Sequence, residues 1–175
     1  MQPFLQQIAT GAVAGVLGTV AMDLVWYGRY RRGGGTDGPL AWEFAGSVAS
    51  FDEASAPGKV GKRLADTGGI ELPDSAAAMI TNAMHWLTGA GYGVAHAVLL
   101  DDRPPLLAGV ATGVGAVANS YATLGAMGVY APVWKYDAAT VAEDVSAHVV
   151  FGVATSFAYR ALSGLSARAR SAART

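Results

Sequence analysis

The sequence has no cysteine, few charged residues and no excess of either charge sign. Charged side chains make up 14% of the 175 residues, whereas an ordinary soluble domain has roughly 25%. The absence of cysteine excludes a disulfide-stabilised scaffold. With 12 basic and 13 acidic residues, the chain lacks the basic surface of a nucleic-acid-binding domain, so we expect no nucleic-acid partner. An apolar content of 52% excludes intrinsic disorder.

Long apolar runs take the place of the missing charges. A helix needs about 20 residues to cross a bilayer, and four stretches are long enough: residues 4–28, 77–100, 105–129 and 140–163. Their only charged residues are Asp23, Glu143, Asp144 and Arg160. A soluble amphipathic helix would show polar residues every three or four positions. The sequence therefore predicts an all-α membrane protein, with four transmembrane helices in one compact bundle and a single domain over residues 1–175.

The segments between the predicted spans suit a membrane surface. Residues 29–76 form the one long loop, in which two stretches, 41–51 and 57–69, predict short helices lying along the interface. This loop opens with Arg29, Arg31 and Arg32, which we expect to face anionic lipid headgroups. Residues 164–175 form a basic tail. Membrane lipids are therefore predicted partners.

Small residues recur along the predicted spans at spacings that favour close packing. Gly11 and Gly15 lie four residues apart in the first span, and Gly109 and Gly113 do so in the third. Lipid tails give helices no hydrophobic reason to associate, so small residues that allow close van der Waals contact favour a bundle. One such stripe is also available for a homo-oligomer or a partner membrane subunit.

Ionisable residues inside a membrane cost about 2.5–3.5 kcal/mol each on insertion scales, so they indicate a partner or a function. His85 and His148 each lie eight residues after the start of two parallel spans, which places both about 12 Å below one surface. Asp23 lies five residues before the end of the first span, and Asp144 lies one turn before His148. We therefore predict an ion or proton site of Asp23, His85, Asp144 and His148. The residues expected to extend or support it are Asn82, Tyr92, His96, Asn119 and Glu143.

Three functions fit this cluster. The first is proton or cation transport, because histidine changes its charge near neutral pH. The second is a metal centre in which His85, His148 and Asp144 bind a divalent ion, or in which the two histidines ligate a haem. The third is a hydrogen-bonded cluster that only packs the helices of an accessory or structural subunit. The cofactor stays open between a divalent metal, a haem and none. The chain has no phosphate-loop or nucleophile motif, so we do not expect a hydrolase. A metal centre with an open coordination position would leave a membrane metalloenzyme as an alternative to a protein without enzymatic activity.

The same histidines carry a resemblance to a known family. The chain resembles the YagU-like proteins, small bacterial inner-membrane proteins with one span, a long loop and three further spans. That family has a histidine early in its second span, matched by His85, and an acidic residue four positions before a histidine in its last span, matched by Asp144 and His148. The family pattern there is Glu-x-x-x-His, whereas this chain has aspartate, with Glu143 beside it. The likeness extends from Phe4 to Gly164.

The resemblance implies a multi-pass protein of the bacterial plasma (inner) membrane, with cytoplasmic termini and a role linked to acid tolerance. It supplies no mechanism. The charge count leans the other way on orientation, because the connections opposite the termini hold seven of the 12 basic residues and cytoplasmic loops carry the excess. We favour cytoplasmic termini.

Overall fold

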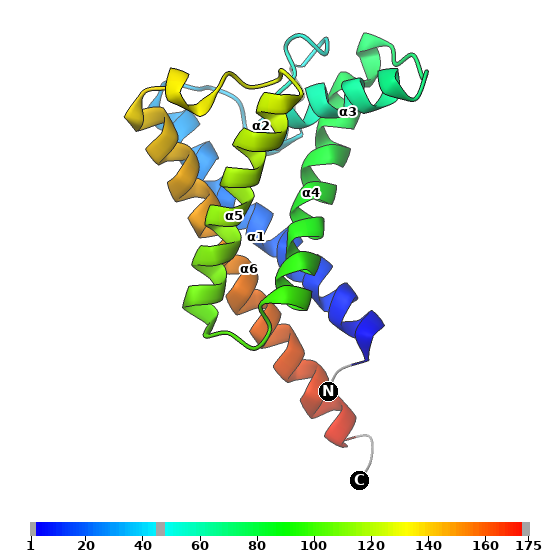
Figure 1. The fold of residues 1–175 in the computed structure, drawn as a ribbon, viewed down its shortest axis with the longest axis vertical. Coiled ribbons are helices and arrows are strands. Elements are labelled where there is room, and N and C mark those ends of the chain that lie inside the picture. Colours follow the sequence, from blue (N-terminus) through cyan, green and yellow to red (C-terminus); the bar gives the residue numbers. More distant parts are fainter. Residues whose placement is uncertain (1–2, 45–47, 173–175) are drawn as a thin grey trace. The chain divides into compact units, whose positions relative to one another are not determined.

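The computed structural model describes residues 3–44 and 48–172, and this part of the chain consists of helices and loops without a strand (Figure 1). Its α-helices are α1 (Phe4–Arg32), α2 (Pro39–Glu43), α3 (Ala56–Thr67), α4 (Ala77–Leu99), α5 (Pro105–Ala126) and α6 (Ala138–Ala172). Two short 3₁₀ helices, η1 (Asp74–Ala76) and η2 (Val133–Lys135), precede α4 and α6. The all-α prediction is therefore confirmed.

The four long helices cover the four predicted apolar stretches but differ from them at the ends. α1 continues beyond residue 28 to Arg32, and α5 ends at Ala126. α6 continues through most of the predicted basic tail to Ala172, while residues 173–175 of that tail lie outside the described residues. Two of these helices, α1 and the Ala138–Ser166 part of α6, are long and apolar enough to cross a membrane.

The other two long helices, α4 and α5, do not meet the same combined test of length and hydropathy. α4 contains Asn82, His85 and His96, and α5 combines its glycines and threonines with Asn119. These residues lower the mean hydropathy even though α5 has no charged side chain. Two helices thus qualify as membrane spans by length and composition, and the four-span arrangement stays a prediction.

The chain divides into two compact units, and each long helix contributes residues to both. The first unit comprises residues 1–22, 89–117 and 142–175, and the second comprises residues 23–88 and 118–141. The first contains the glycine-rich parts of the long helices. The second contains α2 and α3, the end of α1, the beginning of α4, the end of α5 and the first residues of α6.

In the first unit, glycine allows helices to meet backbone to backbone. A Cβ atom added at Gly11 of α1 would lie 2.7 Å from the carbonyl oxygen of Gly93 in α4. One added at Gly109 of α5 would lie 2.6 Å from Cα of Val153 in α6. Both separations are too short for a real side chain. The glycine stripes predicted in the first and third spans are therefore the surfaces at which α1 meets α4 and α5 meets α6. The buried apolar cluster of this unit consists of Ala14, Ala97 and Tyr159.

In the second unit, α3 packs against the beginning of α4. Gly58 and Gly61 are the buried residues of α3, and a Cβ atom at Gly61 would lie 3.0 Å from Cγ of Met84. The helix stops where Gly69 adopts a φ of 73°, a left-handed conformation that glycine adopts freely. The helix predicted within residues 57–69 is thus present. The one predicted within 41–51 is shorter, because α2 ends at Glu43, and residues 45–47 lie outside the described residues.

Candidate metal centre

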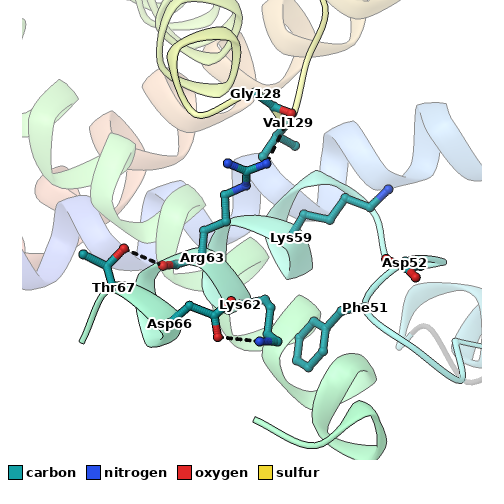
Figure 2. A pocket seen from close by; sticks show the side chains of 9 residues that line it. All are labelled: Phe51, Asp52, Lys59, Lys62, Arg63, Asp66, Thr67, Gly128 and Val129. Atoms are coloured by element: carbon teal, nitrogen blue, oxygen red, sulfur yellow. Dashed lines mark hydrogen bonds and ion pairs between the residues drawn. The ribbon is translucent and has the colours of Figure 1, made fainter. Parts of the chain in front are cut away.

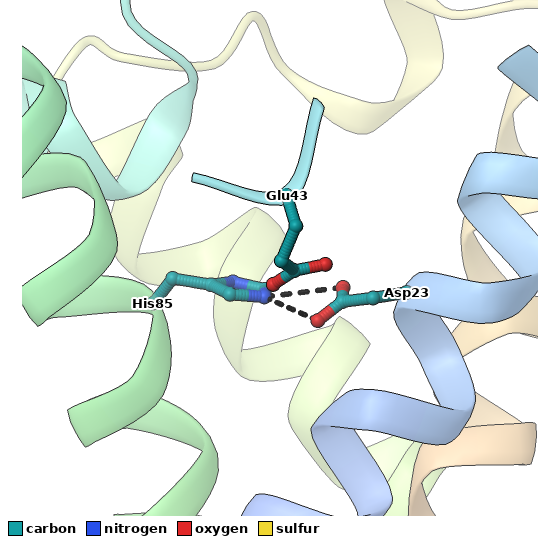
Figure 3. Close-up of side chains that lie close together, drawn as sticks. All are labelled: Asp23, Glu43 and His85. Carbon is teal, nitrogen blue, oxygen red and sulfur yellow. Dashed lines mark hydrogen bonds and ion pairs between the residues drawn. The ribbon is translucent and has the colours of Figure 1, made fainter. Parts of the chain in front are cut away.

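A buried carboxylate and an imidazole form the centre of the second unit. Asp23 belongs to the part of α1 that carries the sequence AMDLVWYG, and it is 6% exposed. The Nε2 atom of His85, from α4, lies 2.9 Å from Oδ2 and 3.1 Å from Oδ1 of Asp23. The ring therefore faces both carboxylate oxygens, as Figure 3 shows. Asp23 and His85, which the helix spacing predicts to lie at one level of the protein, are in contact.

A second carboxylate, from Glu43 at the end of α2, lies over this pair (Figure 3). One ligand atom from each of Asp23, Glu43 and His85 can be chosen so that all three lie within 4.8 Å of one another. The Oε1 atom of Glu43 is buried and has no hydrogen-bond partner in the described part of the chain. Burial raises the pKa of Glu43 above its usual value, and the nearby negative charge of Asp23 raises this pKa further. The fold therefore presents an acid that would be stabilised by a proton or a cation.

Hydrogen bonds between α1 and the residues just before α2 fix the position of the segment that carries Glu43. The hydroxyl of Tyr30 donates to Oδ2 of Asp37 at 2.6 Å and accepts from the backbone N–H groups of Thr36 and Asp37, each at 3.1 Å. The hydroxyl of Tyr27 donates to the carbonyl of Asp37 at 3.1 Å. Glu43 follows Asp37 by six residues. These bonds therefore fix the start of the chain reversal that brings Glu43 back to α1.

The C-terminal end of α2 contacts both α1 and α4. The ring of Trp42 packs against Tyr27 and Tyr30, with centroid distances of 5.4 and 6.1 Å. On the other side, Nδ2 of Asn82 donates to the carbonyl of Phe44 at 2.9 Å. Asn82, predicted as a supporting residue, therefore positions the segment that carries the second carboxylate.

We expect Tyr30→Phe to loosen this segment without changing the fold. The variant removes the acceptor of two backbone N–H groups, and a net hydrogen bond contributes about 0.5–1.5 kcal/mol. Hydrogen exchange at Thr36 and Asp37 should therefore become about tenfold faster. Tyr136→Phe is the matched control, because its hydroxyl serves Ala131 in another loop at 3.1 Å. Equal exchange rates in Tyr30→Phe and the parent protein would contradict this role.

The donor set of this cluster suits a divalent transition metal. One imidazole with two carboxylates is a combination found around zinc, and related sets bind iron and manganese. Such ions bind imidazole nitrogen and carboxylate oxygen at about 2.0–2.2 Å. To coordinate, His85 must present the lone pair of Nε2, so any proton between it and Asp23 would leave as the metal enters.

The second predicted pair, Asp144 and His148, belongs to the first unit. Nδ1 of His148 lies 2.8 Å from the backbone carbonyl oxygen of Asp144. A carbonyl only accepts, so Nδ1 carries a proton, and in the neutral ring Nε2 presents its lone pair. This is the arrangement in which a histidine is oriented for metal binding. A site shared by His148 and His85, whether for an ion or a haem, stays a prediction.

His96 and Tyr92, predicted as a polar path, make contacts inside the first unit. Thr112 donates its only hydroxyl proton to the carbonyl of Ala108 at 2.9 Å, so it accepts from Nδ1 of His96 at 2.7 Å. The imidazole also packs edge-on against the ring of Tyr159. Tyr92 contributes a long hydrogen bond of 3.5 Å from its hydroxyl to a carbonyl of α5. Both residues thus link α4 to its neighbours.

The remaining predicted residues lie outside the three-residue cluster. Asn119 and Glu143 are exposed, and their backbone carbonyls accept hydrogen bonds from Thr123 and Ser146. At the end of α1, Arg31 and Arg32 are exposed. Arg29 instead lies over the ring of Trp26, 4.8 Å from its centroid. Lipid contact by the three arginines stays a prediction.

Glu43 is the residue that the sequence analysis does not identify. It lies in a stretch interpreted only as an interfacial helix, and no spacing relates it to Asp23 or His85. The available signal is indirect, because a buried acid such as Asp23 calls for neutralising partners.

Comparisons with known proteins give no match of any kind. No family model matches the chain, no curated protein matches it significantly, and no solved structure does either. The resemblance to the YagU-like proteins therefore stays a prediction, and the geometry of the cluster alone supports a functional interpretation.

Proposed function

We propose that this chain is a membrane protein that binds a divalent transition-metal ion through Asp23, Glu43 and His85. The observation that carries the proposal is the buried Oε1 atom of Glu43, which has no hydrogen-bond partner in the described part of the chain. One carboxylate oxygen of Glu43 lies within 4.8 Å of ligand atoms from the other two residues. A metal ion would give all three groups a common partner.

The charges favour this reading over a purely structural ion pair. Asp23 and His85 alone would form a complete pair at 2.9 Å. A second, charged carboxylate beside them adds repulsion and a desolvation cost, which either a proton on Glu43 or a bound cation offsets. A divalent cation neutralises both carboxylates and requires only the neutral imidazole. Metal binding therefore accounts for the presence of the third residue.

The membrane part of the proposal extends to four spans and one bundle. It is supported by the hydropathy of α1 and α6, by the absence of charge in α5, and by the close glycine contacts between helices. A multi-pass protein of the bacterial inner membrane, with cytoplasmic termini, follows from the resemblance to the YagU-like proteins. A homo-oligomer or a partner subunit would use the lipid-facing surface of the same helices.

Transport of protons or cations is the second candidate function. It is favoured by the position of Asp23, because a buried acid on an apolar helix is typical of an ion pathway. The cluster also contains an imidazole, the side chain whose charge changes near neutral pH. A link to acid tolerance would follow from this role.

The test is a zinc titration of the purified protein after removal of metal by a chelator. We expect one ion per chain, and a loss of affinity of about 100-fold or more in Glu43→Gln and in His85→Ala, because even residues that only orient a ligand contribute about 10–100-fold. Glu71→Gln is the matched control, since Glu71 is an exposed carboxylate outside the cluster. Affinity should fall with decreasing pH, because protons compete for the same ligand atoms.

Two outcomes separate the candidates. Equal zinc affinity in the parent protein and Glu43→Gln would overturn the metal site. His148→Ala tests the wider ligand set, because only a shared site would lose affinity in that variant. The same proteins in liposomes with a pH-sensitive dye test transport, and equal proton fluxes for the parent and His85→Ala would contradict it.

A further inference from the structure

A pocket of about 630 Å³ lies between α3 and the loop that follows α5, in the second unit. Figure 2 shows its lining, to which α3 contributes Lys59, Lys62 and Arg63, and the loop contributes Gly128 and Val129. None of the residues of the proposed metal centre lines it. The pocket is therefore a separate feature that the metal-binding proposal does not explain.

The three basic residues follow one another at helical spacing. Lys62 and Arg63 come three and four positions after Lys59, so all three project from the same side of α3. The adjoining side of this helix is packed against α4 through Gly58 and Gly61. The packing of α3 thus fixes the direction in which its basic side chains point.

Two of the three cations are not neutralised by a carboxylate. Lys62 pairs with Asp66, one turn further along α3. Arg63 reaches only the carbonyl of Gly128, at 3.5 Å, and Lys59 has no side-chain hydrogen bond or ion pair within the described ranges. Asp52 also lines the pocket. Three cations therefore face two carboxylates, and Lys59 and Arg63 are available to an anion.

The surroundings favour an anion attached to a lipid. Phe51 gives the pocket an apolar wall. α3 precedes the start of α4, and Gly128 follows the end of α5. In the proposed four-span arrangement, both of these ends lie at the same membrane surface, where phospholipid headgroups are found.

We propose that this pocket binds the phosphate group of an anionic phospholipid, with Lys59 and Arg63 as its ligands. The proposal rests on the membrane location proposed above but is independent of the metal centre. Arginine binds phosphate oxygens through its paired N–H donors, and lysine binds them as a point charge.

The experiment is native mass spectrometry of the full chain in a neutral detergent, with phosphatidylglycerol or zwitterionic phosphatidylcholine added. We expect retained phosphatidylglycerol, and binding at least tenfold weaker in Lys59→Gln/Arg63→Gln, because each of these two basic residues contributes about 1 kcal/mol near an anionic membrane. Lys135→Gln, an exposed cation outside the pocket, should bind as the parent does. The exchanged variant Lys59→Arg/Arg63→Lys keeps both charges and should also retain the lipid.

Three results would overturn the proposal: equal retention of phosphatidylglycerol in the neutralised variant and the parent, equal retention of the two lipids by the parent, or displacement of the lipid by inorganic phosphate at the same concentration. The last result would assign the pocket to free phosphate. Matching far-ultraviolet circular dichroism and thermal unfolding of the neutralised variant and the parent show that the variant is folded. Release of the protein from membranes by alkaline carbonate would separately refute the membrane location.

Discussion

Gly93→Ala should destabilise the first unit by about 3 kcal/mol or more. A Cβ atom at this position of α4 would lie 2.6 Å from both Cα and N of Gly15 in α1. These are backbone atoms inside a helix, so relief requires the two helices to move apart along their contact. Overpacking of a rigid core costs about 1–3 kcal/mol, and a clash between two backbones lies at the upper end of that range.

Gly91→Ala is the matched control on the same helix. No atom lies within 4 Å of a Cβ added there, and alanine is favoured over glycine in a helix by about 1 kcal/mol. This variant should therefore be as stable as the parent or slightly more so. Thermal unfolding of both variants in detergent, followed by circular dichroism, makes the comparison. Similar midpoints for Gly91→Ala and Gly93→Ala would show that α1 and α4 do not pack as described.

The difference between these two glycines marks the limit of the sequence analysis for the fold. Apolar runs and small-residue spacing predict that α1, α4, α5 and α6 exist and pack through glycine. These patterns do not predict which glycines of GAGYG face α1, because that depends on the rotation of α4 about its axis. Residue composition likewise predicts which segments are helices and which are loops. It does not decide whether α4 and α5 cross a membrane.

The candidate site divides in a similar way. Asp23 and His85 were predicted together because counting residues along two helices gives their depth, and the contact at 2.9 Å agrees with that count. Counting fails for Glu43, which is placed by a chain reversal. That reversal depends on hydrogen bonds from Tyr30 to Asp37, and such tertiary contacts have no periodic signature in the sequence.

His85→Leu should be more destabilising than Asp23→Leu, although the two residues form one pair. Without His85, the carboxylate of Asp23 stays 6% exposed beside Glu43, and an uncompensated buried charge costs about 3–5 kcal/mol. Without Asp23, the imidazole can remain neutral, and Glu43 loses the repulsion of its neighbour. The cost is then close to that of one unsatisfied polar group, about 1–3 kcal/mol.

The double variant Asp23→Leu/His85→Leu should recover most of the loss, because replacing both members of a buried pair with apolar residues is often neutral. Unfolding free energies of the four proteins, measured in chelator, give the coupling between the two side chains. Destabilisation of the double variant by the full sum of the single effects would exclude an energetic link. Zinc provides a second measurement, since a ligand that binds only the folded state raises the free energy of unfolding as the ligand concentration increases. Zinc should stabilise the parent protein and should not stabilise the double variant. A double variant that regains the lost unfolding free energy but does not respond to zinc would show that the pair serves metal binding and not packing.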